Sequence, residues 1–242
     1  MALNSFLLAV QFLTRLPVSP AYSEAAMAAS PRWYPAAGVL VGAVGALVWG
    51  LAPWPPLVSA LVTLAVMVAV TGGLHEDGLA DTFDGLGGVR PKERAMEIMR
   101  DSRIGTYGVL ALVVSLGVRG AGFAELQALP FVLVAGAAAS RGAMVWAMAT
   151  SRYARATGAG SAVAGGIDAA TVRVAAVTVA LALVPLLFVL PLGQVALGLL
   201  GLGLGAWAIR AWYQRRLGGY TGDCLGAVQQ CAEIGFILGL LA

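Results

Sequence analysis

The sequence predicts an all-α, polytopic membrane protein of about seven transmembrane helices with an interfacial N-terminal helix. Of its 242 residues, 60% are hydrophobic and only 11% are charged. A water-soluble globule needs more charge than this to cover its surface, so the composition indicates a membrane protein. At roughly 20 apolar residues per crossing, the chain is long enough for roughly six to eight helices with short loops. We therefore expect one integral membrane domain over residues 1–242.

Apolar runs separated by short polar loops define the expected helices. They cover residues 36–52, 57–74, 105–124, 130–150, 172–190, 193–212 and 224–242. The opening stretch, from Ala2 to Leu16, has apolar residues at helical spacing but is short for a crossing, so we expect it to lie in the interface. The 32 glycines suit helices that approach closely in lipid.

Basic residues favour one side of the predicted membrane. Thirteen of the 15 lie at the ends of the helices or in alternate loops, which the positive-inside rule assigns to the cytoplasm. The exceptions are Arg119, which this topology puts in an outer loop, and Arg141, which falls within a helix. Because the basic residues are dispersed and form no stripe with aromatic residues, we expect no nucleic-acid partner.

The strongest chemical signal is an acidic segment at the end of the second apolar run. It reads Thr71-Gly-Gly-Leu-His-Glu-Asp-Gly-Leu-Ala-Asp-Thr-Phe-Asp-Gly. The spacing of Asp77, Asp81 and Asp84 is i, i+4, i+7, which puts them on one face of a helix. Like charges there repel unless a cation lies among them, and Mg²⁺ combines carboxylates with substrate phosphates. The segment predicts a metal–diphosphate site, the alternative being a solvated acidic loop. His75 and Glu76 flank it as candidate substrate contacts.

A second polar segment, Met99-Arg-Asp-Ser-Arg-Ile-Gly-Thr-Tyr-Gly, opens the third apolar run. Arg100 and Arg103 suit multi-donor recognition of phosphate, and the helix N-terminus near Gly105 offers free N–H groups to an anion. Asp101 is a candidate further ligand or general base. The alternative is that Asp101 and Ser102 cap the helix while the arginines follow the positive-inside rule.

A third segment, Leu217-Gly-Gly-Tyr-Thr-Gly-Asp-Cys-Leu-Gly-Ala, falls on the same predicted side. Its carboxylate is Asp223, and its glycines allow a ligand to approach the backbone closely. The alternative is an ordinary glycine turn in which Asp223 caps the last helix. Arg141 and Glu233 lie within predicted helices, where ionisable residues are candidates for function or for a mutual structural pair.

These three segments, together with the opening Phe-Leu-Thr-Arg-Leu-Pro-Val (residues 12–18), resemble the cobalamin synthase family. Members of that family are the adenosylcobinamide-GDP ribazoletransferases of bacterial cobamide assembly. The resemblance implies Mg²⁺-dependent attack of a ribose hydroxyl of α-ribazole 5′-phosphate, or of α-ribazole, on adenosylcobinamide-GDP. The products are GMP and adenosylcobalamin 5′-phosphate, or adenosylcobalamin. It further implies a lipid-embedded protein of the bacterial inner membrane whose site faces the cytoplasm.

The candidate site residues fall into three groups. The expected Mg²⁺ ligands are Asp77, Asp81 and Asp84, and the candidate catalytic residues are Asp84, Asp101 and Arg103. The candidate substrate-binding residues are His75, Glu76, Arg100, Arg103, Thr106, Tyr107, Arg141, Tyr220 and Asp223. We expect the three segments to converge on one cavity.

Two rival functions stay open. Asp81-Thr-Phe-Asp84-Gly85 also matches the opening Asp-x-x-Asp-Gly of CDP-alcohol phosphotransferases, although the later aspartate pair of that signature is absent and Asp101 stands alone. Another membrane enzyme of that kind is therefore one alternative. The other is a small-solute transporter that uses Arg141 and Glu233 as intramembrane coupling groups.

Overall fold

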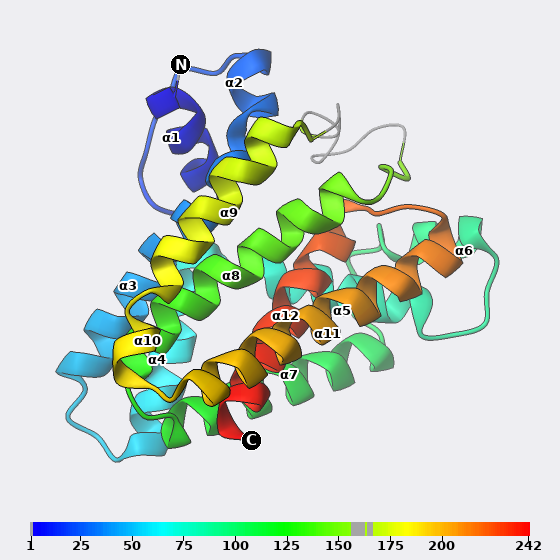
Figure 1. Cartoon of the computed structure of the whole chain (residues 1–242). Helices are drawn as coiled ribbons and strands as arrows, with labels where there is room; N and C mark the ends of the chain where they lie inside the picture. The colour runs from blue at the N-terminus through cyan, green and yellow to red at the C-terminus, as the bar shows by residue number, and fades with distance from the viewer. Residues whose placement is uncertain (1, 156–162, 164–166) are drawn as a thin grey trace.

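The computed structural model describes the chain except residues 1, 156–162 and 164–166, and α-helices dominate the described part (Figure 1). The helices are α1 (Ala2–Leu13), α2 (Glu24–Ala28), α3 (Tyr34–Leu51), α4 (Pro56–Thr71), α5 (Leu74–Leu86), α6 (Lys92–Ile98), α7 (Thr106–Glu125), α8 (Leu129–Ala149), α9 (Ala169–Leu183), α10 (Leu186–Val189), α11 (Leu192–Leu217) and α12 (Gly222–Leu241). A 3₁₀ turn, η1 (Ser30–Trp33), leads into α3. The all-α prediction is confirmed.

Six helical segments of the described chain are long and apolar enough to cross a membrane. They are Ser30–Leu51, Thr106–Glu125, Leu129–Ala149, Ala169–Val189, Leu192–Leu217 and Gly222–Leu241. Helices α4 and α5 pass the same test only as a pair, and the pair is bent by 87°. The chain is thus a multi-pass membrane protein. The helix predicted over 57–74 is present as α4, but it ends at Thr71, where the chain bends.

Proline and glycine mark where the long helices begin and end. Pro35, Pro56 and Pro130 lie in the first turns of α3, α4 and α8. Proline fits there because backbone N–H groups in the first turn have no hydrogen-bond partner within the helix. Gly218 follows α11 in the left-handed conformation, with φ 75°, which closes that helix. Helix α11 therefore runs five residues beyond the predicted end at 212, as far as Leu217.

Helix α12 is the central element of the bundle. It packs against α5, α7, α8 and α11, and Figure 1 shows it enclosed by these helices. Gly201 of α11 and Gly235 of α12 face each other so closely that their backbones touch, as small residues permit in lipid. The buried side of α5 rests on α12 in the same manner, because Gly78 lies against Asp223 and Gly226.

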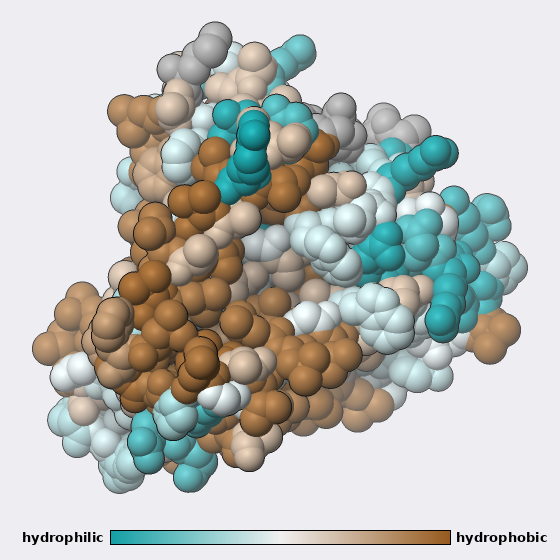
Figure 2. Space-filling view, in the orientation of Figure 1, coloured by the Kyte–Doolittle hydropathy of each residue, from teal (hydrophilic) through white to brown (hydrophobic). Residues whose placement is uncertain are grey.

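The surface is divided into an apolar face and a polar end (Figure 2). Hydrophobic side chains cover α9, α10 and α11, whereas hydrophilic ones gather around α6 and the C-terminal end of α11. In the Ala169–Val189 segment, which comprises α9 and α10, only 11% of the most apolar stretch is buried within the protein. Most of this segment therefore faces outward. An apolar surface of this extent is what lipid-facing helices present.

Candidate active site

Two glycines produce the bend between α4 and α5. Gly72 and Gly73 have φ values of 66° and 69°, a left-handed conformation that glycine adopts without steric cost. The N–H of Gly72 donates to Ala69 O and that of Gly73 to Val68 O, which closes the C-terminus of α4. The acidic helix α5 therefore starts in a new direction and does not continue the apolar helix.

A cavity of about 850 Å³, hereafter the main cavity, lies beside α5. Asp77 and Asp81 line it from α5, and Arg100 and Asp101 line it from the segment after α6. Arg15, which follows α1, contributes to a further wall. Two of the three predicted segments thus meet in one cavity that presents both carboxylates and guanidinium groups.

The carboxylates of α5 form the negative part of the site. Asp81 is half-buried and experiences the negative charge of Asp77, Asp84 and Asp223, opposed by the positive charge of Arg155. Arg155 donates to Asp223 Oδ2 at 2.7 Å. Asp223 does not line the main cavity, but its charge and its ion pair with Arg155 reach the acidic cluster. Thr221, and not Asp223, caps α12, because its hydroxyl accepts from Cys224 N–H.

Asp84 is engaged by α7. Its two carboxylate oxygens accept hydrogen bonds from Gly105 N–H at 2.7 Å and from Gly108 N–H at 2.9 Å, and the residue is buried. These are free amides at the start of α7, so Asp84 acts as a cap supplied by another helix. The amides near Gly105 that the sequence assigned to phosphate are therefore occupied by Asp84, and Asp84 does not line the main cavity.

Asp101 forms an exposed ion pair with Arg103. The guanidinium donates to Asp101 Oδ2 at 2.6 Å and to Oδ1 at 3.0 Å, while the Arg103 side chain is 87% exposed. These hydrogen bonds lower the pKa of the Asp101 carboxyl to about 2. So low a pKa makes a weak general base near neutral pH, and the geometry favours Asp101 as a residue that orients Arg103. Neither Asp101 nor Ser102 caps α7, since its N-cap position is Gly105.

A buried polar cluster lies on the other side of Glu76. Glu76 Oε1 accepts from Arg119 Nη2 at 2.8 Å and from Gln230 Nε2 at 3.0 Å, and Glu233 lies 3.9 Å from the Arg119 guanidinium. The predicted outer-loop position of Arg119 was wrong, because Arg119 is buried within α7, where these partners offset the cost of its charge. Arg141 donates to Ala137 O at 3.0 Å and experiences the charges of Glu233 and Glu76.

A second cavity of about 10 Å³, the small cavity, is enclosed by this cluster. Glu76 lines both the small and the main cavity, whereas His75 and Arg141 line only the small one. Within the described residues, His75 Nε2, Glu76 Oε2 and Arg141 Nε have no hydrogen-bond partner. The volume is about that of one water molecule.

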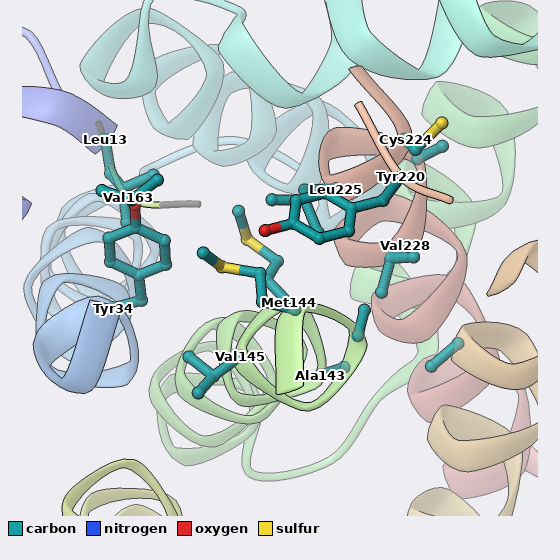
Figure 3. Close-up of a cluster of buried hydrophobic side chains, with 14 of the residues drawn as sticks. Leu13, Tyr34, Ala143, Met144, Val145, Val163, Tyr220, Cys224, Leu225 and Val228 are labelled. Carbon is teal, nitrogen blue, oxygen red and sulfur yellow. The ribbon is translucent and has the colours of Figure 1, made fainter. Parts of the chain in front are cut away.

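The predicted substrate contacts Thr106, Tyr107 and Tyr220 do not line the main cavity. Tyr220 is buried in an apolar cluster, where Figure 3 shows its ring beside Met144 and Leu225. Thr106 and Tyr107 are exposed in the first turn of α7, with the Tyr107 ring against Gly87. The third predicted segment is thus adjacent to the acidic cluster through Asp223 but does not line the main cavity.

Two basic residues near the site were missing from the sequence-based set. Arg15 lines the main cavity, and its backbone N–H donates to Val70 O at 2.7 Å, beside the bend. The signal for it was present in the opening Phe-Leu-Thr-Arg motif. Arg155 reaches Asp223 across 68 residues, and neither its spacing nor its neighbours in the sequence indicate this pairing.

The donors in the main cavity fit a hard cation that also binds phosphate. Within the part of the chain that the structure describes, no three His, Cys, Asp or Glu side chains form a ready-made metal cage. Mg²⁺ does not need one, since it uses one or two carboxylates and completes its shell with water and substrate phosphates. Asp77 and Asp81 on one wall meet that requirement.

Comparisons with known proteins identify the family of the chain. The family model described as cobalamin-5-phosphate synthase matches residues 5–241. The adenosylcobinamide-GDP ribazoletransferase of Leptothrix cholodnii is 43% identical, with 98% of this chain and 94% of that protein aligned. Those of Rhizobium etli strain CIAT 652 and Polaromonas sp. are 41% and 36% identical, over 96% and 98% of this chain and 94% and 96% of their own lengths. No solved structure matches the chain significantly. On this near-complete match, the chain belongs to the cobalamin-5-phosphate synthase family.

Proposed function

We propose that this protein is an adenosylcobinamide-GDP ribazoletransferase. A ribose hydroxyl oxygen of α-ribazole 5′-phosphate, or of α-ribazole, attacks the phosphorus next to cobinamide. A new P–O bond forms, the bond to the bridging oxygen of GMP breaks, GMP takes that electron pair, and the hydroxyl loses its proton. The products are adenosylcobalamin 5′-phosphate, or adenosylcobalamin, and GMP. The relatives that carry this name align over nearly their whole length, which supports the assignment.

The observation that carries the proposal is the charge distribution in the main cavity. Carboxylates of Asp77 and Asp81 line one part, and the guanidinium groups of Arg100 and Arg15 line other parts of the same 850 Å³ space. A diphosphate needs both, since its oxygens bind guanidinium groups directly and bind carboxylates through a cation. The cavity is also large enough for a sizeable part of two substrates.

In this proposal Asp77 and Asp81 hold Mg²⁺, and Asp84 supports them from the N-terminus of α7. Bound Mg²⁺ would act as a Lewis acid on the diphosphate and stabilise the negative charge of departing GMP. Arg100 binds phosphate oxygens from the opposite segment. Asp101 lines the main cavity and orients the exposed Arg103 guanidinium, which does not itself line that cavity, through two hydrogen bonds to one carboxylate.

The proposed location is the bacterial inner membrane, with the main cavity open to the cytoplasm. The basic residues of the α5–α7 connection support this orientation through the positive-inside rule. They include Arg90, Lys92, Arg94, Arg100 and Arg103.

The test is a reaction of the purified protein in lipid nanodiscs with adenosylcobinamide-GDP and α-ribazole 5′-phosphate. We expect equimolar GMP and adenosylcobalamin 5′-phosphate, identified by liquid chromatography and mass spectrometry, in the presence of Mg²⁺. Full activity in excess chelator would refute the metal requirement. Release of CMP from a CDP-alcohol, without any reaction of adenosylcobinamide-GDP, would favour the CDP-alcohol phosphotransferase alternative.

The transporter alternative has less support. It relies on Arg141 and Glu233 as coupling groups beside a passage through the protein. The space between them is the small cavity of about 10 Å³, which has room for about one water molecule and not for a solute. Glu233 is moreover engaged by Gln229 of its own helix.

A further inference from the structure

The junction between α4 and α5 does not by itself fix the orientation of the acidic helix α5. It consists of Gly72 and Gly73, two consecutive left-handed residues, and the helices that it joins differ in direction by 87°. Glycine restricts backbone rotation less than any other residue. The direction in which α5 points its side chains must therefore be fixed by contacts along the helix itself.

Glu76 makes such a contact on the buried side of α5. Arg119 of α7 and Gln230 of α12 both donate to its Oε1, at 2.8 and 3.0 Å. Ser115 Oγ donates to Gln230 Oε1 at 2.7 Å, which turns the amide so that its NH₂ group faces Glu76. The Glu76 and Arg119 side chains are 11% and 4% exposed. A buried carboxylate with two donors from two helices is a strong and directional anchor.

The anchored residue is next to the residues proposed to bind metal. Successive residues of a helix are about 100° apart around its axis. Once Glu76 is fixed toward α7 and α12, Asp77 is directed into the main cavity, and Asp81 follows one turn later. Glu76 itself borders the main and the small cavity, so it lies at the boundary between the anchor and the site.

We propose that Arg119 and Gln230 are positioning residues for the reaction. Through Glu76 they fix the rotation of α5 about its axis, and this rotation aims the Asp77 and Asp81 carboxylates at one point in the main cavity. The inference rests on the proposed function, in which those two carboxylates bind Mg²⁺. It assigns Glu76 to the same anchor, in place of a direct contact with substrate.

Glu233 provides a matched control. It is buried to a similar degree, since its side chain is 6% exposed against 11% for that of Glu76, and it also lies near Arg119, at 3.9 Å. Its hydrogen bond within the described residues is to Gln229 of its own helix, and none reaches α5. Glu76→Asp and Glu233→Asp each shorten a buried carboxylate by one methylene and retain its charge.

The experiment compares wild type, Glu76→Asp and Glu233→Asp as purified full-length proteins. Mn²⁺, which takes oxygen ligands as Mg²⁺ does, reports on the metal site through the electron paramagnetic resonance signal of the free ion. A second measurement is the Mg²⁺ concentration for half-maximal GMP release. We expect Glu76→Asp to weaken Mn²⁺ binding by about tenfold to a hundredfold, the usual effect of losing a residue that orients metal ligands. Glu233→Asp should keep the wild-type affinity, although both variants should unfold at lower temperature than wild type.

Equal Mn²⁺ affinity of the two variants would overturn the inference, because a purely stabilising cluster affects both alike. Absence of Mn²⁺ binding to the wild type would instead refute the proposed metal site, and the inference with it. If Glu76→Asp cannot be purified folded, Gln230→Met decides, since it removes one of the two donors and keeps the side-chain volume. Unchanged Mn²⁺ binding by that folded variant would contradict the proposal.

Discussion

Replacing Asp84 with Asn distinguishes a helix cap from a metal ligand. In the structure both carboxylate oxygens of Asp84 accept hydrogen bonds from the first amides of α7, at 2.7 and 2.9 Å. Asn has one acceptor oxygen, and its NH₂ group would face the second N–H. The substitution therefore removes one hydrogen bond to a charged group and removes a negative charge from a helix N-terminus, while it preserves the volume of the side chain.

The expected loss of stability follows from these two contributions. A buried hydrogen bond to a charged group is worth about 1.5–3 kcal/mol, and a negative charge at a helix N-terminus about 0.3–1 kcal/mol. Allowing for relaxation, we expect the free energy of unfolding to fall by about 2–3 kcal/mol. For a chain of this length each kcal/mol lowers Tm by about 2–4 °C, so the fall in Tm should be about 4–12 °C.

The assay is thermal unfolding in detergent, followed by intrinsic fluorescence, together with Mn²⁺ affinity. Asp77→Asn is the matched control, because Asp77 is exposed in the main cavity, and it should keep the wild-type Tm while losing metal affinity. If Asp84→Asn keeps the wild-type Tm and loses Mn²⁺ affinity as Asp77→Asn does, then Asp84 is a metal ligand and the capping interpretation is wrong.

Four further outcomes are expected. Asp77→Asn should lower the rate of GMP release about a hundredfold, equivalent to about 3 kcal/mol of transition-state stabilisation, with partial recovery at high Mg²⁺; near-normal turnover at low Mg²⁺ would contradict this. Arg100→Lys or Arg103→Lys should lower turnover because Lys cannot make a two-point phosphate contact, and unchanged rates in both would leave the positive-inside rule as the better explanation. Because the pKa of Asp101 is held at about 2, the residue stays ionised and the rate between about pH 5 and about pH 9 should show no acid limb from it. An acid limb that disappears in Asp101→Asn would refute that assignment. Gly78→Leu should lower Tm by several degrees, since a Cβ there would lie 2.8 Å from a backbone oxygen of α12.

The local sequence pattern was sufficient to predict the helices and part of the site. The apolar runs and the i, i+4, i+7 spacing depend on neighbours in the chain, and both the bundle and the helical acidic face were predicted from them. The bend after Thr71 was missed because a Gly-Gly pair within an apolar run is equally compatible with an unbroken membrane helix. Left-handed φ values decide the matter, and they are a property of the folded backbone.

The partners of the charged residues could not be read from the sequence. Asp84 meets amides 21 and 24 residues away, and Glu76 meets Gln230 at a separation of 154 residues. Arg119 was assigned to an outer loop from its place in the predicted alternation of helices and loops, and nothing in the sequence indicated the carboxylate on α5 that pairs with it. Long-range pairing was therefore the missing information.

The residues that line the main cavity all fall between Gln11 and Leu112, whereas α12, the helix that braces α5 from behind, comes much later in the chain. A ribosome thus completes every wall of the main cavity long before it completes the support for one of them. A message cut short before α12 would yield a product that still carries the full set of recognisable motifs for metal and phosphate. Such a product would lack Gln230 and the glycine surface on which Gly78 rests. In genomes, an intact acidic motif in a gene fragment is accordingly poor evidence of an active enzyme, and the codons of α12 are the better indicator.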